Sequence, residues 1–274
     1  MNTTIDVITL GVEALEPARD FYEHGLGAAV REEHDGTLTV TLGGNASRLA
    51  LRPWAELAED AGAHEPARGF RGFTLSYILE SAEAVDVLLA RAERHGGTIS
   101  KPPKSALWGY SAYVTDPSGC LWKIASSKRR PLIGRGGSPA ENGAAVKAQE
   151  VPITIGVADV REAKTFYEDA LGLPVKKDYR KFVMLSGGDG ASGLALYSRE
   201  ALADDAAVPP EGSGFRGFEL THVADSGDSV QALLERAARA GAAIVKTPDS
   251  MPARGASGHF TDPDGNLWKI VTAG

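Results

Sequence analysis

The sequence predicts an α+β protein of two tandem domains, and three observations carry this prediction. Residues 1–127 and 149–274 match each other at an offset of 145 residues, which becomes 146 after one inserted residue, so the chain contains an internal duplication. Inside each copy, apolar residues recur with the period of a strand and then with that of a helix, twice over. With 43% apolar and 24% charged residues, the chain has the composition of a folded globular protein.

The duplication is visible in three pairs of segments. They are ITLGV (8–12) with ITIGV (153–157), GFRGF (69–73) with GFRGF (214–218), and TDPSGCLWKI (115–124) with TDPDGNLWKI (261–270). Residues 128–148 lie between the copies and are rich in Gly, Ala and charge without apolar periodicity, so we predict a flexible linker there. The predicted domains are residues 1–127 and 149–274.

The first half of copy one predicts a strand, a helix and two short strands. DVITLGV (6–12) is apolar and β-branched, as expected of a buried strand. The next segment has apolar residues at helical spacing, which are Leu15, Ala18, Phe21, Tyr22 and Leu26. Pro17 suits the first turn of that helix. TLTVTL (37–42) and SRLALR (47–52) then follow as short strands.

The second half of copy one repeats this order. GFTLSYIL (72–79) predicts a strand, and residues 81–97 predict a helix. Four apolar side chains share one face of that helix, which are Val85, Leu88, Leu89 and Ala92. Two more strands are expected at about 108–115 and 120–126. Copy two shows the same order, so the chain holds four strand, helix and strands units.

The repeated decapeptide predicts a hairpin with a buried tryptophan. In its DPxG segment, Pro presets φ at one turn position, Asp can accept a hydrogen bond from a following amide, and Gly takes the unusual φ. The apolar pair after the turn begins the next strand, which places Trp122 and Trp268 in the core. A lysine follows each tryptophan directly, as Lys123 and Lys269.

Charge and cysteine content exclude several classes of protein. The formal net charge is -7, whereas a nucleic-acid binder needs clustered Lys and Arg, and the basic run at 128–130 is too short to change this. Cys120 is the single cysteine, so no disulfide can form within the chain and a reducing compartment is expected. The first residues lack a basic flank followed by a long apolar run, so we predict a cytoplasmic protein without a signal peptide or membrane span.

These motifs, in this order and written twice, resemble the vicinal oxygen chelate superfamily, which includes glyoxalase I, extradiol dioxygenases and bleomycin-resistance proteins. The resemblance covers both copies nearly end to end. It implies two βαβββ modules per domain, whose mixed sheets curl into cups with helices outside. It also implies that single-domain relatives build sites by pairing two chains, a pairing that a tandem chain can make internally. We therefore expect a monomer with internal domain pairing, or a homodimer.

The resemblance implies a divalent metal in the enzymes of the family, held in the cup by His, Gln or Glu. The corresponding positions here are Val7 and Pro152 on the opening strands, Thr74 and Glu219 on the strands of the second modules, and Lys123 and Lys269 after the tryptophans. Among them, Glu219 alone is a plausible ligand. A lysine ammonium has no lone pair and repels a cation, so neither copy is expected to hold a metal, and no cofactor is predicted.

Strand alternation gives the other side chains that would face the cups if the ligand positions do. In copy one these are Thr9, Ser76, Ser111 and Tyr113, and in copy two they are Thr154, Thr221, Ser257 and His259. Glu219 and Lys269 would approach each other in the second copy, either as a charged anchor for a ligand or as a structural ion pair. No catalytic residue is assigned, although Glu219 and His259 are candidates.

Aromatic side chains in looser segments of copy one add candidates for a ligand wall. They are Trp54, Trp108 and Tyr110, for which ordinary rim packing is the alternative. The predicted ligand-binding set therefore comprises Thr9, Trp54, Thr74, Ser76, Trp108, Tyr110, Tyr113, Lys123, Thr154, Glu219, Thr221, His259 and Lys269.

We expect a metal-independent protein that binds a small organic molecule, such as an antibiotic or another natural product. The first alternative is a lyase, isomerase or dioxygenase that uses acid-base residues or a metal held by unexpected ligands such as Glu219 and His259. The second is a scaffold or regulatory module whose cups have no ligand. Neither nucleic acid nor a membrane is an expected partner.

Overall fold

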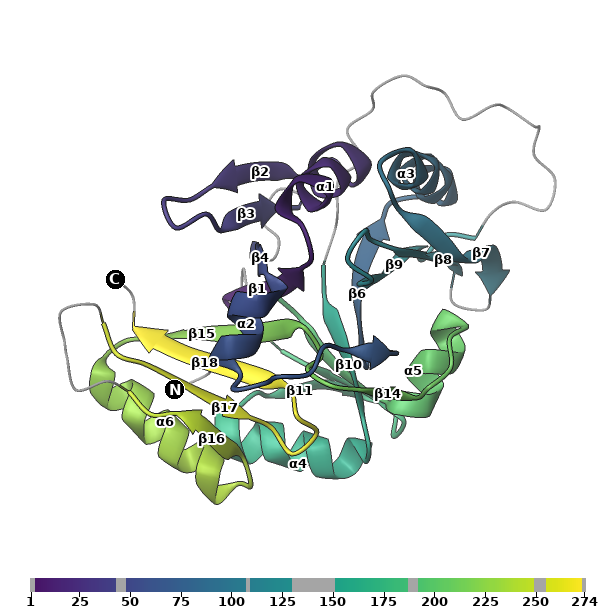
Figure 1. Ribbon diagram of the computed structural model, residues 1–274. Coiled ribbons are helices and arrows are strands. Elements are labelled where there is room, and N and C mark those ends of the chain that lie inside the picture. Colours follow the sequence, from purple (N-terminus) through teal and green to yellow (C-terminus); the bar gives the residue numbers. More distant parts are fainter. Residues whose placement is uncertain are drawn as a thin grey trace.

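The structure, a computed structural model, describes residues 3–42, 48–106, 109–129, 151–186, 192–248 and 255–272. Within these ranges the chain forms two eight-stranded mixed sheets, a two-stranded sheet and helices that pack on the large sheets (Figure 1). The predicted α+β class and the βαβββ order are confirmed. The predicted linker lies outside the described residues apart from its first two. No helix in the described ranges is long and apolar enough to cross a membrane.

The elements of each copy follow one another in the same order. Copy one contains β1 (Val7–Val12), α1 (Leu15–Asp20), the π-helical turn η1 (Phe21–Gly25), β2 (Ala29–Glu32), β3 (Leu38–Thr41), β4 (Arg48–Pro53), α2 (Trp54–Asp60), β5 (Arg68–Gly69), β6 (Phe73–Leu79), α3 (Ala82–Arg94), β7 (Thr98–Ala106), β8 (Gly109–Thr115) and β9 (Leu121–Ser126). Copy two contains β10 (Ile153–Val157), α4 (Val160–Leu171), β11 (Val175–Asp178), β12 (Phe182–Leu185), β13 (Leu194–Ser198), α5 (Arg199–Ala206), β14 (Gly212–Ser213), β15 (Phe218–Ala224), α6 (Gly227–Arg239), β16 (Ala243–Lys246), β17 (Ser257–Thr261) and β18 (Leu267–Thr272).

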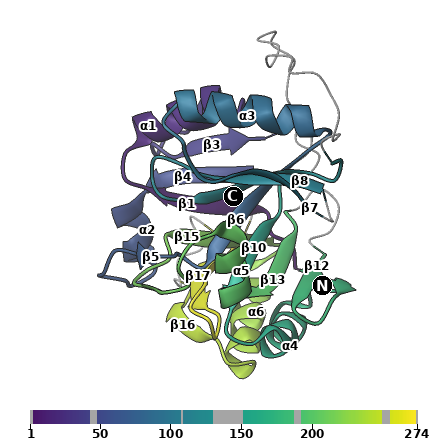
Figure 2. The ribbon, with the colours of Figure 1, turned by 90° about the vertical axis from the view of Figure 1, so that its right-hand side faces the viewer.

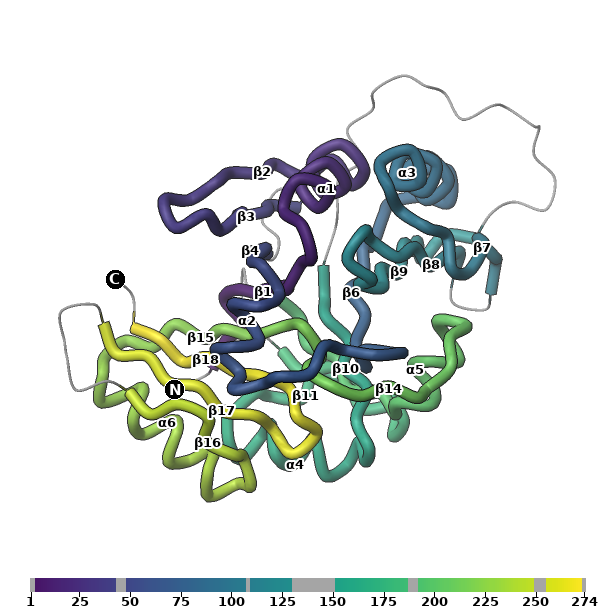
Figure 3. The backbone as a smooth tube through the Cα atoms, viewed as in Figure 1, coloured from purple at the N-terminus to yellow at the C-terminus, as the bar shows by residue number. Residues whose placement is uncertain are grey.

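Each large sheet combines one unit of copy one with one unit of copy two. The first sheet has the order β16-β17-β18-β15-β1-β4-β3-β2, and the second has the order β11-β12-β13-β10-β6-β9-β8-β7. The two junctions, β1 with β15 and β6 with β10, are both antiparallel. The tube in Figure 3 shows most of copy one, which begins in purple, above copy two, which ends in yellow, while the blue stretch from α2 onward reaches down beside copy two. Both sheets thus run across the boundary between the copies.

The long helices cover the outer side of each copy. Figure 2 shows α1 and α3 above the strands, and α4 and α6 below them. The helices of one copy contact each other, η1 with α3 and α4 with α6, although they cover different sheets. The apolar face predicted for α3 is confirmed, because all four of its predicted side chains are buried. Ser81 caps this helix and accepts a hydrogen bond from the amide of Ala84 at 3.1 Å.

The repeated GFRGF segment forms the junction between the copies. Gly72 and Gly217 adopt φ of 80° and 72°, which glycine tolerates best. Their carbonyl oxygens accept hydrogen bonds from the amides of Gly156 and Gly11, at 2.7 Å and 2.9 Å respectively. Phe73 then meets its counterpart in copy two, Phe218, with ring centroids 4.3 Å apart. Each copy of the segment therefore pairs with the opening strand of the other copy, and the two copies meet through these phenylalanine rings.

The repeated decapeptide forms the predicted hairpin and anchors it to a helix. Asp116 accepts hydrogen bonds from the amides of Ser118 and Cys120, at 2.9 Å and 2.8 Å. Its other oxygen accepts a bond from the Tyr22 hydroxyl at 2.8 Å. Trp122 is fully buried, as predicted, and its indole N–H donates to Tyr22 at 3.4 Å. Burial raises the pKa of the Asp116 carboxyl.

Copy two contains the same network. The Tyr167 hydroxyl donates to Asp262 at 2.5 Å, and the indole of the fully buried Trp268 donates to Tyr167 at 3.5 Å. Burial raises the pKa of Asp262 as well. The TDPxGxLW part of the motif therefore stabilises the fold in both copies, whereas the lysine after the tryptophan points to the opposite face of its strand.

Candidate functional site

Strand alternation gives each large sheet an outer face, which packs on the helices, and an inner face. In β1, Ile8 and Leu10 enter the main core and Thr9 points the other way. We call the inner face of the sheet that contains β1 and β15 the first inner face, and that of the sheet that contains β6 and β10 the second inner face. Of the predicted residues, the first inner face carries Thr9, Glu219, Thr221, His259 and Lys269, and the second carries Thr74, Ser76, Tyr113, Lys123 and Thr154.

These two groups differ from the grouping by copy that the sequence suggested. Thr9 of copy one lies directly opposite Glu219 of copy two, and Thr154 of copy two lies opposite Thr74 of copy one. The reason is the pairing of units across the copies. Each inner face therefore takes its polar side chains from both halves of the chain.

Glu219 and His259 form a buried contact at the centre of the first inner face. One carboxylate oxygen of Glu219 lies 3.3 Å from Nε2 of His259, and the two side chains are only 2% and 3% exposed. The other oxygen accepts a weak hydrogen bond from the Thr221 hydroxyl at 3.4 Å. Glu219 Oε2 and both ring nitrogens of His259 have no hydrogen-bond partner among the described residues. This contact becomes an ion pair when His259 is protonated.

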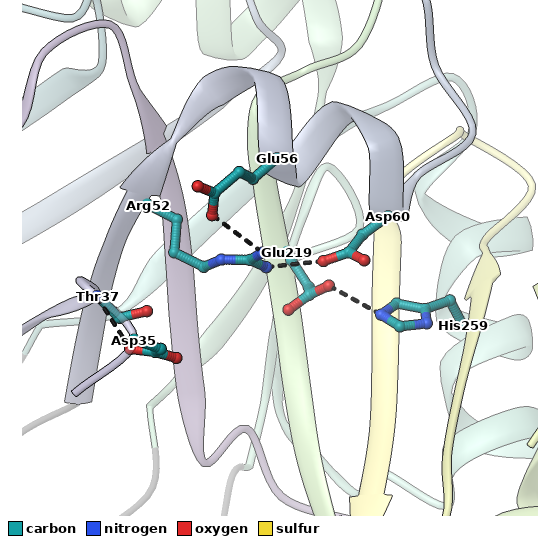
Figure 4. A network of polar contacts seen from close by, with 7 residues as sticks. All are labelled: Asp35, Thr37, Arg52, Glu56, Asp60, Glu219 and His259. Carbon is teal, nitrogen blue, oxygen red and sulfur yellow. Dashed lines mark hydrogen bonds and ion pairs between the residues drawn. The ribbon is translucent and has the colours of Figure 1, made fainter. Parts of the chain in front are cut away.

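The short helix α2 lies over the first inner face and adds a second carboxylate. Gly11 permits the close approach, because a Cβ there would lie 3.1 Å from Cδ1 of Trp54. Asp60, the last residue of α2, accepts a hydrogen bond from Arg52 at 2.7 Å. Figure 4 shows Glu219 between this Arg52–Asp60 pair and His259. The helix thus places a charged pair beside the buried contact.

Neighbouring positive charges lower the pKa of Asp60. Burial alone would raise the pKa of Asp60, but the hydrogen bond and the charge of Arg52 hold that pKa below its ordinary value. The charges of His259 and Lys269 act in the same direction. Lys269 lies opposite His259 on the neighbouring strand and is half-buried.

The predicted contact between Glu219 and Lys269 does not form an ion pair. Glu219 lies against His259 instead, and Lys269 has no hydrogen-bond or ion-pair partner within the part of the chain that the structure describes. Lys269 is therefore an unpaired cation at the margin of the buried group.

The lysine that follows the tryptophan on the second inner face has partners within the chain. Lys123 corresponds to Lys269, and its ammonium lies 2.5 Å from a carboxylate oxygen of Asp205. The Tyr113 hydroxyl donates to the same oxygen at 2.6 Å, and Lys101 lies 3.8 Å from the other. Burial and the charge of Asp205 raise the pKa of Tyr113. The two faces therefore share ancestry, but they differ in whether the lysine after the tryptophan has a partner.

Asp60, Asp205 and Arg52 were missed by sequence reasoning. Asp60 and Asp205 stand 145 residues apart, at the offset of the duplication, and each lies in the last turn of a short helix that covers an inner face. A comparison of the two copies for shared acidic residues would have found the pair. Arg52 was hidden because it closes a strand-like run whose partner strands could not be known.

The predicted aromatic wall is not assembled at this site. Trp54 packs against Phe215, with ring centroids 5.9 Å apart, at the start of α2. Tyr110 is on the outer face of β8, where its hydroxyl donates to Asp86 of α3 at 2.7 Å, because it stands one residue out of phase with Ser111 and Tyr113. Trp108 lies outside the described residues.

The metal-ligand positions that the family resemblance implies do not form a donor set on the first inner face. Of these three positions, Val7 has no donor atom and Lys269 offers an ammonium, so Glu219 alone could bind a metal ion. A different trio does come together, because one ligand atom each of Asp60, Glu219 and His259 lie within 4.8 Å of one another. Arg52 already occupies one oxygen of Asp60.

A protein-family model matches both copies of the duplication. The model is described as the glyoxalase/bleomycin resistance protein/dioxygenase superfamily and matches residues 4–124 and 151–270. No curated protein matches the chain.

Solved structures of the same architecture cover the whole chain. Glyoxalase I from Zea mays is 18% identical with a TM-score of 0.64, over 98% of this chain and 92% of that chain. A candidate dioxygenase from Bacillus subtilis subsp. subtilis str. 168 is 17% identical with a TM-score of 0.63, over 99% of this chain and 85% of that chain. At these identities the similarity extends to the fold alone.

Proposed function

The chain belongs to the glyoxalase/bleomycin resistance protein/dioxygenase superfamily, and we propose that it is a member that binds a small organic molecule on its first inner face without a metal. The observation that supports this is the buried contact of Glu219 with His259, in which three polar atoms make no hydrogen bond to the described residues. An unsatisfied buried polar atom costs about 1 to 3 kcal/mol. A ligand that supplies the missing hydrogen bonds would recover part of this free energy.

The charges of the group favour a polar ligand over a divalent cation. Asp60 and Glu219 can carry two negative charges, and Arg52 and Lys269 carry two positive ones, so these four charges balance. A divalent ion would add two positive charges beside Arg52 and Lys269. A neutral or anionic organic molecule adds no such repulsion, and the unpaired Lys269 can bind an oxygen of it.

The proposed ligand therefore carries both hydrogen-bond donors and acceptors. Glu219 can accept a bond from a hydroxyl or amine group, and His259 can donate to or accept from the ligand according to its tautomer. Lys269 would bind a carbonyl, phenolate or carboxylate oxygen. Antibiotics and other natural products often combine these groups. Both copies come from one chain, so no second chain is needed to complete either sheet.

A thermal-shift screen of natural products against the intact protein tests the proposal. We expect at least one polar compound to raise Tm, and the Lys269→Ala variant to lose most of that shift while its own Tm without ligand stays close to that of the wild type. The matched control is Lys176→Ala, because Lys176 is exposed on β11 of the second sheet. Equal ligand shifts for the wild type and Lys269→Ala would contradict the proposed role of Lys269.

A metal-dependent enzyme is the second candidate, and the trio of Asp60, Glu219 and His259 is the observation that favours it. Two carboxylates and one imidazole are a donor set that suits several divalent ions. Metal analysis of protein purified without chelator separates the candidates. We expect much less than one equivalent of metal. About one equivalent that is lost in both Glu219→Gln and His259→Gln would overturn metal independence and support the enzyme.

A further inference from the structure

The second inner face carries a row of aromatic rings that the first inner face lacks. Phe182 on β12 meets Tyr197 on β13 edge to face, with ring centroids 5.6 Å apart. Tyr179 stacks on the other side of Phe182 at 6.5 Å and is 62% exposed. Phe182 and Tyr197 are half-buried. The row therefore presents aromatic surface that solvent can reach.

This row arose by divergence of the two copies. The residues at the same offset in copy one are Thr37 for Phe182 and Arg52 for Tyr197. Arg52 belongs to the charged group of the first inner face, where it binds Asp60. The same two positions therefore carry charge and hydroxyl on one face and rings on the other.

Three mostly buried residues on the same face as the aromatic row carry hydroxyl groups. Thr154, Thr74 and Ser76 are 8%, 1% and 6% exposed and point to the second inner face. None of their hydroxyls has a hydrogen-bond partner among residues in the described ranges, and solvent still reaches the hydroxyl oxygens. Thr154 stands one strand away from Tyr197, two residues along the ladder. A bound molecule could supply the missing partners.

On β11, the edge strand of the second sheet, this face carries a lysine without a partner among the described side chains. Lys177 pairs with Met184 across β11 and β12, so it lies on the same face as the rings. It is exposed and has no hydrogen-bond or ion-pair partner among the described side chains. Asp205, the acidic group nearer the centre, is already bound to Lys123 and Tyr113. The remaining free charge on this face therefore favours an anion.

We propose that the second inner face is a separate binding site for a small planar aromatic molecule with an anionic group, such as an aromatic carboxylate. The ring stacks on Phe182 and Tyr197, the anionic group meets Lys177, and a polar edge reaches the hydroxyl of Thr154. A protein partner fits this face less well, because the residues that carry the hydroxyls are at most 8% exposed and a small ligand reaches them more easily than a protein surface does. The inference is independent of the ligand proposed for the first inner face.

Isothermal titration of the intact protein with 1-naphthoate tests this site. Two matched probes accompany it, namely 1-naphthalenemethanol, which has no charge, and cyclohexanecarboxylate, which has no aromatic ring. The variants are Phe182→Leu and Tyr197→Leu, which keep an apolar side chain but remove the ring, and Lys177→Gln. Lys176→Gln is the control for loss of the same charge one residue away, and Lys269→Gln is the control for the first inner face.

We expect 1-naphthoate to bind and cyclohexanecarboxylate to bind much more weakly. Each ring variant should raise the Kd for 1-naphthoate about 5-fold, the effect of losing one aromatic contact. Lys177→Gln should reduce the preference for 1-naphthoate over 1-naphthalenemethanol about 3-fold, whereas Lys176→Gln and Lys269→Gln should leave it unchanged. Circular dichroism checks that each variant is folded.

Two results would overturn the inference. One is the absence of saturable binding of 1-naphthoate to the wild type. The other is binding that Phe182→Leu and Tyr197→Leu leave unchanged, including the case in which Lys269→Gln abolishes it and so places the probe on the first inner face. Failure of this site would leave the proposal for the first inner face intact, because the two tests use different variants and probes.

Discussion

At the scale of single residues, the two lysines that follow the tryptophans have different surroundings. Lys123 binds Asp205 on the second inner face, whereas Lys269 has no partner in the described part of the chain, because Arg52 binds the equivalent Asp60. The difference follows from one position: Tyr197 stands in copy two where Arg52 stands in copy one. A lysine without a partner is available to a ligand, and a paired lysine contributes to stability.

We therefore expect unequal costs when each lysine is replaced by methionine. Lys123→Met leaves Asp205 with one fewer charged partner and should lower the free energy of unfolding by about 1 kcal/mol. Lys269→Met removes no hydrogen bond and should change that free energy by less than about 0.5 kcal/mol. Urea denaturation of both variants measures the two values. Equal losses would show that Lys269 has a structural partner.

The contact of Asp205 with Lys123 should also make the stability of the protein depend on pH. Burial alone would raise the pKa of Asp205, but the charge of Lys123 and the hydrogen bonds from Lys123 and Tyr113 hold it below its ordinary value of 3.8. The folded state therefore binds fewer protons at this carboxyl than the unfolded state. Its contribution to stability is present above the unfolded pKa and is lost as the pH falls through the lower, folded pKa.

Asp205→Asn is the variant that isolates this effect. At about pH 6 it should be less stable than the wild type, and the difference should shrink as the pH is lowered toward about pH 3. Urea denaturation at several pH values measures the difference, which cancels the titration of all other carboxyls to a first approximation. A difference that stays constant with pH would mean that the charge of Asp205 contributes nothing.

Several residues of the site could be predicted from sequence, but their partners could not. Strand alternation identified Glu219, Thr221 and His259 as residues of one face, and the structure places them together. It could not supply Asp60 or Arg52, because alternation describes one strand and says nothing about which strand or helix lies beside it. The contact of Glu219 with His259, rather than with Lys269, depends on side-chain geometry that no spacing encodes.

At the scale of elements, the apolar strands and the long helices were predictable and the short polar elements were not. The pattern gave β1, β6, α3 and the hairpin, because each buries one regular face. It missed the edge strands β2 and β7, which are mostly exposed and lack apolar alternation. It also missed α2 and α5, which are too short for helical periodicity to be clear but carry Asp60 and Asp205 over the inner faces.

The close approach of α2 to β1 can be tested with one added methyl group. In Gly11→Ala the new Cβ would lie 3.1 Å from Cδ1 and 3.3 Å from Cα of Trp54, so the first residue of α2 must shift by a few tenths of an ångström. We expect a loss of about 1 to 3 kcal/mol in stability. Binding on the first inner face should weaken as well, because Asp60 moves with the helix. Urea denaturation and the thermal-shift assay measure the two effects.

Gly156→Ala is the matched variant for the second sheet. Its Cβ would lie 3.1 Å from Cα of Arg199, the first residue of α5. We expect a similar loss of stability, with ligand binding on the first inner face unchanged. If both variants weaken that binding equally, the effect is a general loss of stability and not a displacement of α2.

At the scale of the whole molecule, the pairing of units is the feature that sequence could not determine. The apolar opening strands predict that each strand, helix and strands unit must pair with a second unit. A unit from the same copy or from the other copy would bury these strands equally well. The structure pairs each unit with one from the other copy, through β1 with β15 and β6 with β10. Each of the two identical GFRGF segments leads into one of these junction strands, which is compatible with a pseudo-twofold arrangement.

Pairing across the copies predicts that the two halves remain together without a covalent connection. A protease site inserted between residues 130 and 150 allows the chain to be cut after folding. We expect the cut protein to elute from a sizing column at the mass of the intact chain, because both sheets and the contact of Phe73 with Phe218 hold the halves together. Light scattering on the eluted peak measures this mass.

The interface should also govern how easily the cut protein separates in urea. Phe218→Ala removes one of the two rings that meet at the boundary and should lower the urea concentration at which the halves separate, since truncating a buried Phe to Ala costs about 3 to 5 kcal/mol. Tyr179→Ala removes an exposed ring away from the junction and should leave that concentration unchanged. Two half-mass peaks from the cut wild type in the absence of urea would contradict the cross-copy sheets, because strands shared between the copies cannot separate without breaking both sheets.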